Sequence, residues 1–115
     1  MKTSSLNLFN FYPHLRLQET VTPNSLQMEI STLQKIVKDR YYKTDNARGI
    51  YHTALWFHEE VGELSAAIAS GDIENAKEEL ADVQMWLLTL ANLMNIDMEE
   101  VVATYLNDPR KLPSK

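Results

Sequence analysis

Two pairs of carboxylates lie at equal distances on either side of Gly71, and their types and spacing suit them to bind a cation. Glu60 and Glu63 are three residues apart, and so are Glu79 and Asp82, so each pair can share one side of a helix. If the chain reverses at Gly71, all four carboxylates meet at one level of an antiparallel helix pair. Because like charges in one place repel strongly, such a cluster indicates a bound cation.

Helical projection tests whether the two pairs can face each other. The expected apolar stripes are Ala54, Phe57, Val61, Leu64 and Ile68 on a helix over 50–69, and Ala76, Leu80, Val83, Leu87, Leu90 and Met94 on a helix over 73–94. Measured from the stripe centres, the first pair lies about 70° and about 130° away and the second about 60° and about 120°, in the same sense. An antiparallel hairpin then points both acid flanks inward or both outward. Glu59 falls nearly opposite the first stripe, so we rank it below Glu60 as a ligand.

The candidate ligands are all oxygen donors, which hard cations such as Mg²⁺ or Mn²⁺ prefer, whereas Zn²⁺ more often takes His or Cys. A di-iron bundle would carry Glu-x-x-His motifs, but the three-apart partners here are Glu and Asp. The alternative is a solvated helix face with ion pairs along it, which predicts nearby basic residues. No Lys or Arg occurs from Tyr51 to Ala69, and this absence favours the cation site.

Basic side chains are expected to complete the site, because Mg²⁺ on carboxylates usually also binds substrate phosphates. Arg40, Lys43 and Arg48 flank or occupy an expected polar loop over 43–49 and are the candidate phosphate contacts. Solvated loop charges are the alternative interpretation of all three.

Two tryptophans occupy matching places beside the acids. Trp56 is four residues before Glu60, and Trp86 is four residues after Asp82, so both lie on the acid flanks. Either ring could stack on a base or ribose of a nucleotide, although core packing is the default role of tryptophan in a small helical domain.

Composition limits the class of protein. A chain of 115 residues is one domain, and its net charge of −5 argues against a nucleic-acid-binding surface. The absence of cysteine excludes disulfides and thiolate metal sites and suits a reducing cytoplasm. No apolar run approaches the ~20 residues of a membrane span, and the N-terminus shows no apolar core of a signal peptide. We therefore expect a cytoplasmic protein without membrane or nucleic-acid partners.

The remaining patterns predict helices throughout. Residues 1–23 lack periodicity and form an expected arm, which packs on the helices or a partner subunit, or closes over a ligand. Asn24 with Gln27 resembles a capping box, so the first helix should begin at Asn24 or Ser25 and end near Tyr42. The four expected helices cover residues 24–42, 50–69, 73–94 and 98–106. Gly71 and Asp72 suit the end of one helix and the N-cap of the next.

At these residues the chain resembles the MazG-like nucleotide pyrophosphohydrolases, whose signature is EExxE, a spacer and then ExxD. The matching segments are Glu59-Glu60-Val61-Gly62-Glu63-Leu64 and Glu79-Leu80-Ala81-Asp82-Val83. The flanks also match, namely Arg48-Gly49 and Leu55-Trp56-Phe57 before the first motif, and the segments over 86–93 and 95–97 after the second. The resemblance covers about residues 25–106.

The resemblance implies an all-α fold, a four-helix MazG-like bundle over 24–108 between an arm at 1–23 and a tail at 109–115, assembled as a homodimer or a dimer of dimers. It implies Mg²⁺-dependent hydrolysis of nucleoside triphosphates between the α and β phosphates, with Mn²⁺ as a possible substitute. The products would be a nucleoside or deoxynucleoside monophosphate and pyrophosphate. The implied ligands are Glu60, Glu63, Glu79 and Asp82, with Glu59 as an acid that orients ligands or water.

Two other functions stay open at this point. A phosphoribosyl-ATP pyrophosphohydrolase shares the metal chemistry, although the longer basic pattern that a phosphoribosyl group requires is not found in the sequence. A helical assembly module that keeps a vestigial cation site without turnover belongs to a different class, and the intact set of acids argues against it.

Overall fold

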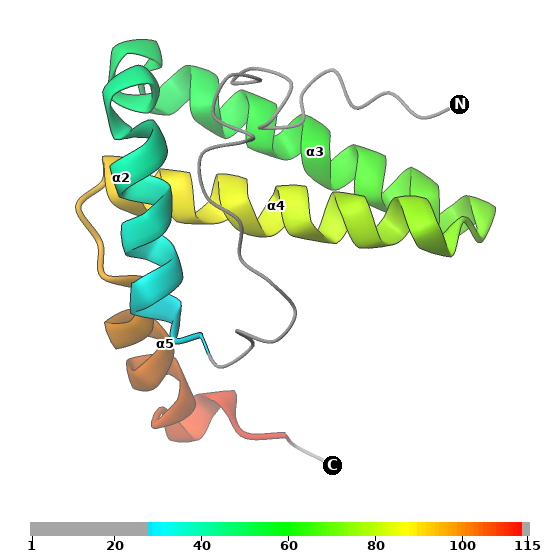
Figure 1. The fold of residues 1–115 in the computed structure, drawn as a ribbon. Helices are drawn as coiled ribbons and strands as arrows, with labels where there is room; N and C mark the ends of the chain where they lie inside the picture. Colours follow the sequence, from blue (N-terminus) through cyan, green and yellow to red (C-terminus); the bar gives the residue numbers. More distant parts are fainter. Residues whose placement is uncertain (1–27, 114–115) are drawn as a thin grey trace.

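The computed structural model describes residues 28–113, which form an all-α fold without a strand among them (Figure 1). The elements are α2 (Ile30–Arg48), α3 (Ile50–Ser70), α4 (Ile73–Leu93), α5 (Met98–Leu106) and the short 3₁₀ helix η2 (Pro109–Lys111). The prediction of an all-α chain is confirmed for this part of the molecule. The expected arm over 1–23 and the Asn24–Gln27 capping box lie outside the described residues.

The acid-bearing helices α3 and α4 form an antiparallel hairpin that closes at Gly71, as the sequence predicted (Figure 1). Gly71 has φ 72° and ψ 16°, a left-handed conformation that glycine adopts without steric cost. The backbone N–H groups of Gly71 and Asp72 donate to the carbonyls of Ile68 and Ala67, both at 3.1 Å. Asp72 then caps α4, because its Oδ1 accepts from the backbone N–H of Asn75 at 3.1 Å.

The loop predicted over 43–49 is wrong, because α2 continues through Arg48 and only Gly49 separates it from α3. Residues 43–48 contain no glycine or proline that would end a helix. The ion pair between Asp45 and Arg48, three residues apart, also favours the helical conformation. Gly49 makes the turn between the helices at φ 91°, in the region that only glycine occupies readily.

The predicted start of the first helix is also wrong, since α2 begins only at Ile30 and Glu29 is extended with no side-chain cap. The first turn is capped from another helix instead. The backbone N–H and the hydroxyl of Ser31 donate to Glu99 Oε1 of α5, at 3.1 and 3.2 Å. This tertiary contact satisfies an N–H group that a local cap would otherwise serve.

The core lies where α2 crosses the end of the α3–α4 hairpin (Figure 1). It consists of Val37 and Tyr41 from α2 together with Trp86 and Leu88 from α4. The partly buried residues that pack against this cluster are Ile30, Leu33, Trp56, Phe57, Met85 and Met98. The core therefore fixes the open end of the hairpin, from which the two acid-bearing helices run toward Gly71.

The buried faces of the hairpin are rotated from the predicted stripes toward the acids. The fully buried residues of α3 are Thr53, Glu60 and Ala67. In contrast, Ile68 and Leu80 of the predicted stripes are 64% and 57% exposed. Because α3 and α4 meet along their acid flanks, the two stripes remain partly uncovered on the described chain.

Within residues 28–113, no helix combines the length and the apolarity that crossing a membrane requires.

Candidate metal centre

Three carboxylates converge inside the hairpin. One oxygen from each of Glu60, Glu79 and Asp82 lies within 4.8 Å of the other two, and these three residues are hereafter the acid cluster. All three side chains are buried. The helical projection allowed both acid flanks to point inward or both outward, and for these three residues they point inward. The expected meeting of the carboxylates is confirmed for Glu60, Glu79 and Asp82, whereas the approach of Glu63 to Glu79 stays a prediction.

Glu60 is the most constrained member of the cluster. It is 0% exposed, and neither carboxylate oxygen accepts a hydrogen bond from a donor in the described part of the chain. Burial raises the pKa of Glu60 to about 9, with further increases from the charges of Asp82 and Glu63. Glu79 raises that pKa as well, through its charge and as an acceptor for the proton of a neutral Glu60. Without a cation, Glu60 is therefore protonated at neutral pH.

The two remaining acids of the predicted motif differ in their surroundings. Glu63 is half-buried and lies close enough to Glu60 for its charge to raise the pKa of that residue. Glu59 is exposed, on the side of α3 that the helical projection indicated. Glu63 is thus placed to extend the acid cluster, whereas Glu59 faces solvent in the described chain.

The donor set fits a hard divalent cation. Carboxylate oxygens are the ligands that Mg²⁺ and Mn²⁺ prefer, and buried ionised carboxylates are costly unless a cation or hydrogen-bond donors compensate them. The two oxygens of Glu60 lack such donors among the described residues. A cation shared by Glu60, Glu79 and Asp82 would supply the missing compensation.

Comparison with protein families finds a match over the segment that contains the acid cluster. The sequence model of the MazG nucleotide pyrophosphohydrolase domain matches residues 49–111, more than half of the chain. The chain belongs to the MazG family. Comparison with curated proteins finds no match. The matched segment of this MazG chain begins at Gly49, so it contains α3, α4, α5 and all five acids of the predicted motif but not α2.

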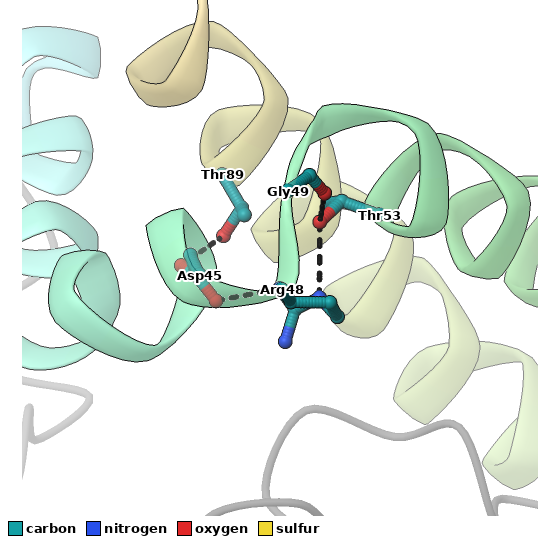
Figure 2. A network of polar contacts seen from close by, with 5 residues as sticks. All are labelled: Asp45, Arg48, Gly49, Thr53 and Thr89. Carbon is teal, nitrogen blue, oxygen red and sulfur yellow. Dashed lines mark hydrogen bonds and ion pairs between the residues drawn. The ribbon is translucent and has the colours of Figure 1, made fainter.

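Of the basic residues predicted to bind phosphate, Arg48 occupies an internal position at the end of α2. Its guanidinium donates from Nη2 to Asp45 Oδ1 at 2.6 Å and from Nε to Thr53 Oγ1 at 2.9 Å, and its side chain is only 10% exposed. Figure 2 shows this network at the junction of α2, α3 and α4, with Thr89 donating to Asp45 Oδ2 at 3.3 Å. Since these contacts hold the guanidinium inside the fold, we do not retain Arg48 as a phosphate contact.

The other two basic candidates lie on the last turns of α2 rather than on a loop. Lys43 is exposed, and Arg40 is half-buried. Both remain candidate phosphate contacts, on a helix instead of a flexible segment.

The two tryptophans pack against each other with their rings perpendicular and their centroids 5.9 Å apart. Trp86 is fully buried in the core, the default role considered for it, so it presents no surface on which a base could stack. Trp56 is half-buried and also lies 5.7 Å from His52, between ring centroids. Trp56 alone of the pair remains a candidate contact for a nucleotide.

A separate groove of about 270 Å³ contains none of the predicted site residues. Its lining consists of Ser31, Gln34, Lys35, Lys38, Asn92, Asn95, Ile96 and Asp97. The amide of Gln34 is already satisfied there, because its Nε2 donates to Asn92 Oδ1 at 3.0 Å and to the carbonyl of Ile96 at 2.7 Å. Its Oε1 accepts from the backbone N–H of Met98 at 2.9 Å. The groove therefore contains a structural network that joins α2 to the α4–α5 connection.

The buried network of Asp45, Thr53 and Thr89 was missed from the sequence. The loop predicted over 43–49 placed Asp45 in solvent, and threonines on helices carry no distinctive signal. The three-residue spacing of Asp45 and Arg48 was the one available indication that this segment continues the helix.

Proposed function

We propose that the protein is a Mg²⁺-dependent nucleoside triphosphate pyrophosphohydrolase. It would use one water to cleave the α–β phosphoanhydride and give a nucleoside or deoxynucleoside monophosphate and pyrophosphate. The observation that supports this most directly is the buried acid cluster, with an uncompensated Glu60, in a chain of the MazG family. Mn²⁺ has the same ligand preference and is expected to substitute.

Each acid has a proposed role. Glu60, Glu79 and Asp82 would hold the cation, with Glu63 beside them at the edge of the cluster. Glu59 would orient water or neighbouring ligands from its exposed position. A divalent ion bound there supplies positive charge for the phosphates, activates the attacking water and offsets charge that develops on the leaving pyrophosphate.

The basic and aromatic neighbours would complete the substrate site. Lys43 and Arg40 on α2 carry positive charges that the triphosphate needs beyond the cation, since an acid cluster alone repels it. The half-buried ring of Trp56 is the candidate surface for the base or ribose.

Pyrophosphate release from a panel of ribo- and deoxyribonucleoside triphosphates, with Mg²⁺ and with excess chelator, tests this function. We expect release with Mg²⁺ and none with chelator, and a Glu60→Gln variant provides the background rate. Turnover of phosphoribosyl-ATP in preference to every triphosphate would instead support that alternative substrate. Absence of turnover on all of them, despite Mn²⁺ binding, would support a non-catalytic module.

We also propose that the chain assembles with copies of itself as a homodimer or a dimer of dimers. The uncovered side chains near the hairpin tip include Ile68, Ile73 and Leu80, each more than half exposed. A domain of this size gains stability by covering such apolar surface, and a second copy offers the same surface by symmetry.

Sedimentation at micromolar concentration is expected to show no monomer. Leu80→Glu should shift the population toward monomer, because a charge would be buried at the contact, whereas Lys35→Glu on the exposed face of α2 should leave the assembly unchanged. A wild-type chain that sediments as an active monomer would contradict the proposal.

A further inference from the structure

A layer of three side chains lies one helical turn from the acid cluster. Trp56 precedes Glu60 by four residues on α3, and Trp86 follows Asp82 by four residues on α4. Because residues four apart are neighbours on a helix surface, the edge-to-face contact of the two rings forms at the level next to the carboxylates. The guanidinium of Arg48 lies over both rings, 5.1 Å from the Trp56 centroid and 4.9 Å from the Trp86 centroid.

Asp45 of α2 and Thr53 of α3 hold this guanidinium in place, and each is supported by a further polar group. The contacts of Arg48 to Asp45 and to the hydroxyl of Thr53 orient its plane, and Thr89 of α4 donates to Asp45. The hydroxyl of Thr53 donates in turn to the carbonyl of Gly49 at 2.7 Å (Figure 2). The end of α2 is thereby tied to both helices of the hairpin.

We propose that Asp45 and Arg48 are positioning residues for the acid cluster. Their ion pair and the edge-to-face tryptophan pair fix the spacing and register of α3 against α4. When Glu60 is ionised, as a metal ligand must be, its charge on α3 faces those of Glu79 and Asp82 on α4. The adjacent layer then holds the two helices against their repulsion. The inference rests on the proposed metal site, but it concerns residues outside the acid motif, on a helix that the family match does not include.

The geometry of the guanidinium is essential to this role. A planar group can lie over two rings while its edge donates to Asp45 and Thr53, whereas the compact ammonium of lysine has neither the plane nor the fixed donor directions. Charge alone at position 48 therefore should not keep the helices in register.

A graded series of variants tests the proposal. Thr89→Val replaces the hydroxyl with a methyl group of similar size. Asp45→Asn removes the negative charge that pairs with Arg48. Arg48→Lys keeps the positive charge but loses the planar guanidinium. Binding of Mn²⁺ is measured by titration calorimetry at a temperature where thermal melts show each variant to be folded. We expect Arg48→Lys and Asp45→Asn to weaken Mn²⁺ binding about tenfold, as removal of residues that orient metal ligands does, and Thr89→Val to weaken it less.

Near-ultraviolet circular dichroism gives a second reading, because the perpendicular tryptophan pair should lose part of its signal in Arg48→Lys. The matched control is Gln34→Met, which breaks the half-buried polar network that joins α2 to α4 and to the α4–α5 connection. This variant is expected to lower thermal stability but to leave Mn²⁺ affinity within twofold of wild type.

The outcomes separate positioning from general stability. Wild-type affinity in folded Arg48→Lys and Asp45→Asn would overturn the proposal, and so would an equal loss of affinity in Gln34→Met. If wild-type protein itself binds no Mn²⁺, the proposed metal site fails, and the positioning role fails with it. Retained binding in wild type without nucleotide turnover contradicts only the proposed activity.

Discussion

Replacing Glu60 with glutamine is expected to abolish metal-dependent hydrolysis while the helical fold is kept. The amide has nearly the shape of the carboxyl group, but it removes the charge from the most buried member of the acid cluster. Even residues that only orient metal ligands cost about 10–100-fold when replaced. We therefore expect a loss of more than about 100-fold in pyrophosphate release for a direct ligand. Asp82→Asn should behave in the same way.

The same substitution is expected to stabilise the metal-free protein. Burial and the neighbouring charges of Asp82, Glu63 and Glu79 all disfavour an ionised Glu60, and a neutral side chain at this position removes that cost. Thermal melts with excess chelator should show a higher midpoint for Glu60→Gln than for wild type at pH 8. Addition of Mg²⁺ should raise the midpoint of wild type more than that of the variant. Turnover close to wild type would show that Glu60 is not a required ligand.

Glu59→Gln is the matched control, since it changes the adjacent glutamate in the same way. Glu59 is exposed, so its loss should leave most of the Mg²⁺ affinity and should not raise the melting midpoint without metal. A larger loss of metal affinity in Glu59→Gln than in Glu60→Gln would reverse the assignment of the two glutamates.

The hairpin and the acid cluster could be predicted from the sequence because their signals are local. A glycine at the helix end, an aspartate cap and two acid pairs at equal distances from the turn determine which residues meet. These features depend on helix periodicity and turn chemistry, and neither requires knowledge of the rest of the fold.

Both ends of α2 were predicted wrongly, because tertiary contacts determine them. Its start is capped by Glu99 from α5, a residue far along the chain. Its final turn looked like a polar loop in the sequence, but Asp45 and Arg48 are buried against Trp56, Trp86 and Thr89. A polar segment that is buried by its partners cannot be told from a solvated loop by composition alone.

The sequence also failed to predict which face of each hairpin helix is buried. Projection treats the most apolar stripe as the buried face, yet Glu60 occupies the centre of the buried face of α3 and Ile68 is largely exposed. The proposed metal site would account for this reversal, since functional sites keep buried polar groups for chemistry at the expense of stability. Apolar residues left outside, such as Ile68 and Leu80, point instead to a surface that another copy would cover.

The stability of the metal-free protein is expected to fall as pH rises from about 5 to about 9. The pKa of Glu60 is about 9 in the fold, against an ordinary value of 4.5. Between these two values the folded chain holds a proton that the unfolded chain has released, so the unfolding free energy decreases with pH. One such group contributes at most about 1.4 kcal/mol per pH unit. The stability is fully present below the lower pKa and is lost progressively toward the upper one.

A divalent cation should reverse this dependence, because it takes the place of the proton among the carboxylates and binds more tightly as the proton leaves. Urea unfolding from pH 5.5 to 9, with chelator and with saturating Mg²⁺, measures both curves. We expect the gap between them to widen with pH in wild type, and we expect Glu60→Gln with chelator to show a flatter curve. The difference between the wild-type and Glu60→Gln curves isolates the contribution of position 60. Equal slopes for wild type and Glu60→Gln with chelator would mean that Glu60 is already ionised in the metal-free fold. In that case its charge would be compensated by groups other than a cation, and the physical argument for a metal at the acid cluster would lose its strongest support.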